Sequence, residues 1–255
     1  MQLNQVLCAA LLAVGLAQTA SADVTIDPTS ALVVNGALGG SAPTGFGASS
    51  LAGNGVNKGE FYISATALFG QAVKISDIAS MSFWTNKAQG AGAPDWTLLL
   101  YTAKQQGDSS WYHTRLNAEP YFVASPTATA GAWHQWTTGG SEALKFYDQP
   151  RSNTFGTYTD PTWSELLAGA VTWDGAGQTG ATVDYREEFV NVFSLQTGSG
   201  WANGFTGQVD GLTITLVSGL SASVNFEGNV IPEPASLALV GVALAGLGVM
   251  RRRKA

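Results

Sequence analysis

Carboxylates are the side chains of this sequence that come nearest to a catalytic set. Glu187 and Glu188 adjoin a predicted strand, and Asp174, Asp184 and Asp210 lie before and after it. A glycoside hydrolase needs two carboxyl groups that face one cleft, about 5–10 Å apart. Adjacent residues of a strand point to opposite faces, so Glu187 and Glu188 alone do not form such a pair. Another catalytic pair drawn from these five carboxylates is conceivable, but we expect no catalytic residues.

The two histidines give little indication of a metal site. His113 and His134 stand in the segments Trp111-Tyr112-His113 and Trp133-His134-Gln135-Trp136, without a second histidine two or four positions away. We expect each to be a strand histidine with a satisfied hydrogen bond. The sequence contains no Gly-x-Ser-x-Gly elbow, phosphate-binding loop or zinc-protease motif.

Tryptophan is the residue type that points to sugar binding, and the chain has eight. Sugar rings pack their C–H faces on flat aromatic surfaces. Trp133 and Trp136 are three positions apart, so in a regular strand they face opposite sides. Because tryptophan is mostly buried, we expect most of the eight in the core. Trp111, Trp136 and Trp201 are our candidates for exposed, sugar-binding positions.

Composition excludes several other kinds of site. The single cysteine, Cys8, lies in a segment that we expect to be removed, so the mature chain has no disulfide or thiol. We predict no cofactor. A structural calcium ion held by dispersed oxygen ligands stays open, although Asp174–Gln178 is too poor in oxygen side chains for an EF-hand loop. The net charge of −6, with four cations clustered at the tail, disfavours nucleic acid as a partner.

The elements that would position these side chains are short strands rich in Val, Ile, Thr and aromatic residues, separated by Gly, Asn, Asp, Ser and Pro. One helix is predicted at Thr162–Ala168, and a loop at Gly39–Asn57. Many strands with one helix indicate an all-β sandwich of jelly-roll type, a single domain over residues 23–230. The predicted strands are Ala31–Asn35, Glu60–Ala67, Ser80–Thr85, Trp96–Thr102, Trp111–Leu116, Ala132–Thr137, Val171–Trp173, Phe189–Leu195, Gly207–Val217 and Ser223–Glu227.

The strand Gly207–Val217 has the clearest alternation. Leu212, Ile214 and Leu216 alternate with Gly211, Thr213 and Thr215, and Val209 belongs to the second set. We expect the leucine and isoleucine set to face the core after Asp210.

Residues 1–22 have the features of a secretory signal peptide. Val6–Ala17 is apolar, and Ala20-Ser21-Ala22 fits a small-x-small cleavage site, which makes Asp23 the first mature residue. No Lys or Arg precedes the apolar run. An N-terminal membrane anchor is the alternative, but the run is short for that.

The C-terminal tail, residues 231–255, has three parts. Pro232-Glu233-Pro234 comes first, the uncharged run Ala235–Met250 follows, and Arg251, Arg252, Arg253 and Lys254 close it. As a helix the run would reach roughly 24 Å, slightly short of a bilayer core. The four cations would stay cytoplasmic as a membrane stop. A buried core helix is the alternative, but such a helix would show a polar face.

These three parts resemble the PEP-CTERM sorting tail of exported Gram-negative proteins. The resemblance implies that signal peptidase first cleaves the N-terminal segment and that the chain then stays transiently in the inner membrane. An exosortase would recognise and process the tail there. It also implies an exopolysaccharide or biofilm setting, and a final place at the cell surface or in the extracellular matrix.

The body carries a second resemblance in scattered motifs. Ser76–Ile78 with Phe83-Trp84, Ala93–Trp96 with Leu100-Tyr101, Gly198–Trp201 with Phe205–Leu212, and Val224–Glu227 resemble concanavalin-like or galactose-binding-like jelly-roll domains. We therefore expect a structural or adhesive protein. A lectin-like carbohydrate-binding module is the alternative, and a glycan hydrolase the third interpretation.

Overall fold

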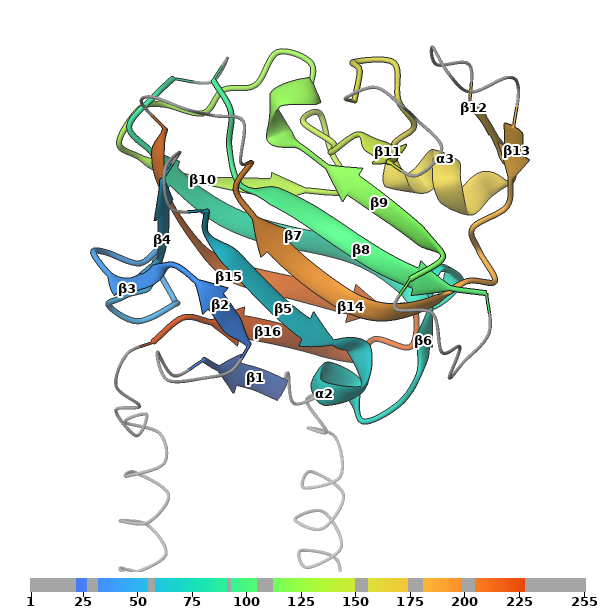
Figure 1. The fold of residues 1–255 in the computed structure, drawn as a ribbon, viewed down its shortest axis with the longest axis horizontal. Helices are drawn as coiled ribbons and strands as arrows, with labels where there is room; N and C mark the ends of the chain where they lie inside the picture. The colour runs from blue at the N-terminus through green and yellow to red at the C-terminus, as the bar shows by residue number, and fades with distance from the viewer. Residues whose placement is uncertain are drawn as a thin grey trace, which may run out of the picture.

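The computed structural model describes residues 22–26, 32–54, 58–90, 93–104, 112–149, 156–173, 181–198 and 205–227. Within these ranges the chain forms two β-sheets packed face to face (Figure 1). The all-β sandwich predicted from the sequence is confirmed.

The first sheet is organised around β15, which pairs with three strands. On one side β15 pairs with β7, which pairs with β10; on the other it pairs with β16 along one half and with β4 along the other. Strand β1 then pairs with β16, and β3 with β4. The strands are β1 (Ala22–Thr25), β3 (Ala37–Gly39), β4 (Ser50–Asn54), β7 (Ile78–Lys87), β10 (Trp133–Thr137), β15 (Thr206–Leu216) and β16 (Ser221–Asn225).

The second sheet has the order β11-β9-β8-β14-β5-β2, with β6 beside β14, and every pairing is antiparallel. The strands are β2 (Val33–Asn35), β5 (Glu60–Ser64), β6 (Val73–Lys74), β8 (Thr97–Ala103), β9 (Thr114–Ala118), β11 (Phe146–Asp148) and β14 (Phe189–Gln196).

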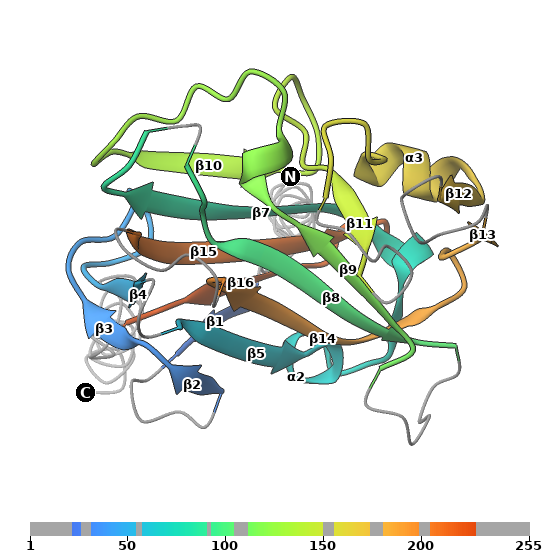
Figure 2. The same cartoon turned by 45° about the horizontal axis from the view of Figure 1, so that its top comes forward.

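Smaller elements lie at the ends of the sandwich. The hairpin of β12 (Val171–Trp173) and β13 (Ala181–Val183) lies with α3 (Trp163–Ala168) at one end, and β3 and β4 lie at the other (Figure 1 and Figure 2). The remaining helical elements are α2 (Ala65–Phe69) and the 3₁₀ turns η1 (Ile75–Asp77) and η2 (Pro120–Phe122).

The core lies between the sheets and is rich in large aromatic side chains. Phe61 of β5 and Phe226, which directly follows β16, meet edge to face with ring centroids 4.9 Å apart. Trp96, Trp136 and Trp163 have no more than 2% of their surface exposed. Burial of such side chains is the main stabilising contribution available to a body whose described part holds no cysteine.

The predicted helix is confirmed, and its local signals explain it. The Thr162 side chain accepts a hydrogen bond from the Glu165 backbone N–H, and the Glu165 carboxylate accepts one from the Thr162 N–H, 2.7 Å away. This reciprocal capping box fixes the first turn, and Gly169 follows the last. Trp163 then donates from Nε1 to the Ile78 carbonyl, 3.1 Å away, which fastens the helix to the core.

A predicted strand end and a predicted loop are wrong, for different reasons. The strand predicted to reach Ala67 ends at Ser64, whose side chain caps α2 by accepting from the Ala67 N–H. The predicted loop Gly39–Asn57 contains β4, because its small residues pair with β3 and β15 despite their weak strand propensity.

The alternation predicted for β15 after Asp210 is confirmed, but it does not continue to the residues before Gly211. Leu212, Ile214 and Leu216 are buried, as predicted, but Val209 is also fully buried. The pairing with β7 shifts register between Asp210 and Thr213, and Gly211 has a φ of +60°. Such a bulge reverses which side chains face the core.

Candidate functional site

The candidate sugar-binding tryptophan that the structure describes is not exposed. Trp136 has no exposed surface and donates from Nε1 to Thr85 Oγ1, 2.8 Å away. Its predicted role in sugar contact is therefore wrong, because Trp136 lies on the face of β10 that points into the core. Trp111 and Trp201 lie outside the described residues. The signal-cleavage residue Ala20 and the tail residues Pro232–Pro234 and Arg251–Lys254 also lie outside them; Ala22 begins β1.

The adjacent glutamates point to opposite faces, as predicted. The Glu187 side chain is 76% exposed and pairs with Lys74 Nζ at 2.6 Å. Glu188 is buried, where its carboxylate accepts hydrogen bonds from the hydroxyl groups of Thr102 and Thr114. The two carboxylates therefore do not share a cleft.

The other described carboxyls of that set also have separate partners. Arg186 donates to both oxygens of Asp184, at 2.9 and 2.6 Å, and these hydrogen bonds lower the pKa of Asp184 to about 2. Burial raises the pKa of Asp210 to about 7, against the hydrogen bonds from the Phe226 and Gly211 N–H groups. Asp174 lies outside the described residues.

His134 has the satisfied hydrogen bond predicted for it. Its Nε2 lies 2.8 Å from Glu142 Oε2, and its ring packs against Trp136 with centroids 4.3 Å apart. His113 precedes β9 rather than lying within a strand. Within the described ranges, no group of three His, Cys, Asp or Glu side chains is arranged to hold a metal ion.

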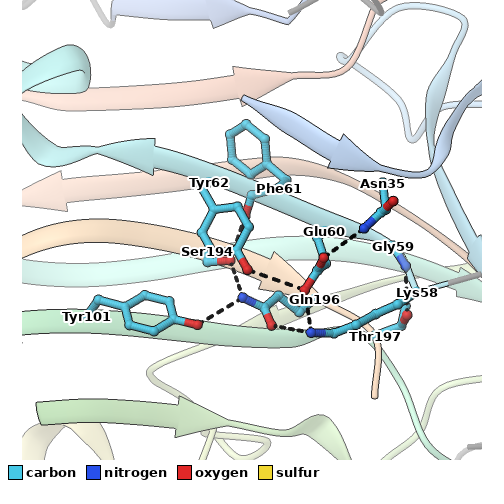
Figure 3. Close-up of polar contacts among 10 residues, drawn as sticks. All are labelled: Asn35, Lys58, Gly59, Glu60, Phe61, Tyr62, Tyr101, Ser194, Gln196 and Thr197. Carbon is cyan, nitrogen blue, oxygen red and sulfur yellow. Dashed lines mark hydrogen bonds and ion pairs between the residues drawn. The ribbon is translucent and has the colours of Figure 1, made fainter. Parts of the chain in front are cut away.

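An extended polar arrangement lies on the outer face of the second sheet (Figure 3). Phe61 and Ile63 of β5 face the core, so Glu60 and Tyr62 face outward. The same alternation on β14 and β8 brings three further side chains to this face. We name the set the Glu60 cluster: Asn35, Lys58, Glu60, Tyr62, Tyr101, Ser194 and Gln196.

Glu60 is the centre of this cluster. It accepts hydrogen bonds from Lys58, from Asn35 Nδ2 at 2.8 Å and from the Tyr62 hydroxyl at 3.3 Å. Burial opposes the ionised form, but the hydrogen bonds from Lys58 and Asn35 outweigh it, so the pKa of Glu60 lies below its ordinary value. Glu60 is therefore a carboxylate at neutral pH.

Gln196 connects Lys58 to the buried part of the cluster. Its Oε1 accepts from Lys58 Nζ at 3.1 Å, and its Nε2 donates to Tyr101 at 3.0 Å and to Ser194 at 2.9 Å (Figure 3). Burial raises the pKa of Tyr62 well above its ordinary value, and neighbouring Tyr101 and Glu60 add to the rise. Tyr62 therefore stays neutral and donates its hydroxyl hydrogen bond to Glu60.

A hollow of about 570 Å³ adjoins the cluster and shares two residues with it, Asn35 and Lys58. The other lining residues are small or polar: Gly36, Ala37, Ala52, Gly53, Asn54 and Thr206. A Cβ on Gly53 would lie 2.8 Å from the Trp96 ring, and one on Gly59 would lie 2.1 Å from it. Glycine at these positions lets the backbone rest on the buried indole.

A third lysine–carboxylate pair, unlike the other two, lies inside the core. Lys87 Nζ is 3.4 Å from Asp95 Oδ2, and it donates to the Ala93 carbonyl at 2.7 Å. Asp95 also accepts from Thr85 Oγ1 at 2.9 Å, and Thr85 in turn accepts from Trp136. We name these four linked side chains, Thr85, Lys87, Asp95 and Trp136, the Asp95 network.

The sequence contained a signal for part of the Glu60 cluster. The alternation Glu60-Phe61-Tyr62-Ile63 lies inside a predicted strand, and it places Glu60 and Tyr62 on one face. Tyr101, Ser194 and Gln196 come from strands far away in the sequence, and nothing local indicates that they meet Glu60.

Comparison with known families identifies the tail. Residues 230–254 match the family model of the PEP-CTERM protein-sorting motif. The chain carries a PEP-CTERM sorting tail. Pro232, Glu233, Pro234 and the four terminal cations lie inside the matched segment.

The tail indicates the route of the protein. PEP-CTERM motifs mark exported Gram-negative proteins that are anchored in the membrane and sorted by an exosortase, so this is an exosortase-sorted exported protein. The match does not extend into the sandwich. No curated protein and no solved structure matches the chain.

The predicted membrane span, residues 235–250, lies outside the described residues. Within the described part of the chain, no helix is long and apolar enough to cross a bilayer.

Proposed function

We propose that the protein is a structural or adhesive component of the cell surface or extracellular matrix, acting without covalent chemistry. After export, the exosortase removes the tail, and the sandwich stays with exopolysaccharide outside the cell. Signal peptidase cuts after Ala22, and no nucleic acid takes part. The observation that carries this proposal is the PEP-CTERM tail on a β-sandwich body.

The way in which the body ends suits the membrane-anchored stage that precedes removal of the tail. The carboxylate of Glu227, the last described residue before the tail, accepts hydrogen bonds from the Ala48 and Ser49 N–H groups, at 2.6 and 3.2 Å. A Cβ on Gly47 would lie 1.8 Å from the same carboxylate. Strand β1 pairs in parallel with β16, so the beginning and end of the described body share one region of the sheet (Figure 1). During the membrane-anchored stage, pull on the tail would act on β16, a strand that is hydrogen-bonded on both sides.

Cell fractionation of a host with its exosortase tests this function. We expect the wild-type chain in the surface or matrix fraction with its tail removed, and in the membrane fraction when the exosortase gene is deleted. Intact chain in the cytosol of the competent host would overturn the proposal. A chain lacking residues 231–255 is the control, and we expect it to lose the membrane-bound stage.

A lectin-like carbohydrate-binding module is the second candidate function. The Glu60 cluster and its hollow favour it, since they offer fixed hydrogen-bonding groups beside an open space. This second candidate assumes that the sandwich is of jelly-roll type and that it is related to concanavalin-like or galactose-binding-like domains. The third candidate, a glycan hydrolase, gains no support from the described carboxyls, which have separate partners.

A further inference from the structure

We propose that the hollow beside the Glu60 cluster binds a segment of a neutral polysaccharide, and that Asn35, Asn54, Lys58 and Thr206 recognise it by hydrogen bonds. This inference rests on the proposed surface function. It names the site and the class of ligand through which the protein would adhere.

The space fits a small polar ligand. A volume of about 570 Å³ lies in the range of protein sites for small molecules, roughly 300–1,000 Å³. Four of the lining residues, Gly36, Ala37, Ala52 and Gly53, have no side chain larger than a methyl group. The hollow therefore exists because the side chains at these positions are small.

The walls are built before any ligand arrives. Asn35, Ala37 and the segment Ala52–Asn54 belong to strands β2, β3 and β4, and Thr206 begins β15. The Trp96 ring lies behind Gly53 and Gly59, and the Gly59 N–H donates to Thr197 Oγ1 at 2.9 Å. A site whose backbone is already ordered loses less conformational entropy on binding.

The polar groups suit hydroxyl ligands. The lining combines an ammonium group, which only donates, with two amides and a hydroxyl group, which donate and accept. Gln196 and Glu60 hold the Lys58 ammonium in place, and Glu60 holds the Asn35 amide. Sugar hydroxyls both donate and accept, so an array of this mixed kind can satisfy several of them at once.

Charge selects a neutral ligand over an anionic one. The Lys58 ammonium is paired with the Glu60 carboxylate, so these two charges cancel at the edge of the hollow. The whole chain carries −6, which repels a polyanion. No residue that lines the hollow has a large apolar side chain, so an apolar ligand or the anchor residue of a peptide would gain little by entering.

Affinity electrophoresis tests the site with the full-length chain in a detergent that lacks a sugar headgroup. The gels contain dextran, galactomannan or mixed-linkage β-glucan as neutral probes, and alginate as the anionic one. Many equivalent sites along an immobilised polymer make weak binding visible as slower migration.

Two variants remove the site in different ways, and one matched variant leaves it intact. Lys58→Met removes the ammonium, and Ala37→Tyr fills the hollow from an exposed position. Lys74→Met removes the lysine of the Lys74–Glu187 pair, whose lysine is 35% exposed against 34% for Lys58. Thermal melting of all chains shows that each variant is folded.

We expect at least one neutral gel to retard the wild-type chain. The affinity derived from this retardation should be about tenfold weaker in Lys58→Met and Ala37→Tyr, and unchanged in Lys74→Met. Retardation by alginate alone would overturn the neutral ligand. Neutral retardation that both site variants keep would overturn the site. No retardation in any gel would overturn the inference, while normal fractionation of the same chain would leave the surface function standing.

Discussion

The Glu60 cluster and the Asp95 network use the same chemistry in opposite settings. Each pairs a lysine with a carboxylate and adds hydroxyl and amide or indole groups. The side chains of Lys58 and Glu60 are 34% and 15% exposed, whereas those of Lys87 and Asp95 are 4% and 0% exposed. The first pair borders a hollow, and the second is enclosed by protein.

This difference in exposure indicates that the Asp95 network stabilises the fold, whereas the Glu60 cluster is free to contact a ligand. In the Asp95 network the lysine, carboxylate, hydroxyl and indole groups bind one another and the backbone, so the network fixes strands β7 and β10 against the loop that leads to β8. In the Glu60 cluster the same kinds of group meet solvent at one edge. Breaking the enclosed pair should therefore cost stability, and breaking the open pair should cost binding.

Removal of Lys87 should have the largest effect on stability. Lys87→Met leaves the buried Asp95 carboxylate without its cation, which we expect to lower the free energy of unfolding by about 3–5 kcal/mol. Lys58→Met should lower it by about 1 kcal/mol or less, because that pair is partly exposed. Chemical denaturation followed by tryptophan fluorescence measures both, and equal losses would refute the comparison.

Asp210 provides a buried carboxylate that accepts from two backbone N–H groups rather than from a lysine. Its folded-state pKa of about 7 lies above the unfolded value of about 3.9, so the folded state holds the proton more tightly. Stability should fall as pH rises from about 4 to 7, and level off above. Asp210→Asn should remove this dependence, gaining on the order of 2–3 kcal/mol over the wild type between pH 4 and pH 8.

Denaturation of both chains across that pH range measures the difference. Parallel stability profiles would show that Asp210 is not protonated in the folded protein. Glu227, whose charge also raises the pKa of Asp210, should be kept in both chains.

Trp136→Phe tests whether the indole is structural. The change removes the hydrogen bond to Thr85 and part of a buried ring, so we expect a loss of about 1–2 kcal/mol in unfolding free energy. Migration through the polysaccharide gels should be unchanged in the folded variant. If Trp136→Phe lost retardation in the gels while its stability stayed unchanged, Trp136 would be a sugar-contacting residue after all.

Glu60→Gln should have the smallest effect on stability. Because the folded-state pKa of Glu60 is lowered, its contribution is present above the unfolded value of 4.5 and is lost as pH falls through the folded value. We expect at most about 1 kcal/mol, visible as a smaller loss of stability in the variant than in the wild type between pH 6 and pH 3. Thermal melting at the two pH values measures it, and a larger loss in the variant would contradict the assignment.

The sequence predicts the structure correctly where the determining signals are local. The capping residues of α3, the alternation of Leu212, Ile214 and Leu216, and the opposite directions of Glu187 and Glu188 follow from neighbours a few positions away. It failed at β4, whose residues have weak strand propensity, and at Trp136, whose face is decided by the sheet that covers it.

The sequence by itself determined the sorting route, the all-β class and most strand positions. The reason is that a PEP-CTERM tail is read along the chain and strand patterns depend on alternating neighbours. Tertiary structure alone decided which tryptophan is buried, which lysine is enclosed, and that Glu60 meets Gln196 across 136 positions of sequence. These outcomes depend on pairing between distant strands, where one shift of register, such as that at Gly211, reverses the face on which a side chain lies.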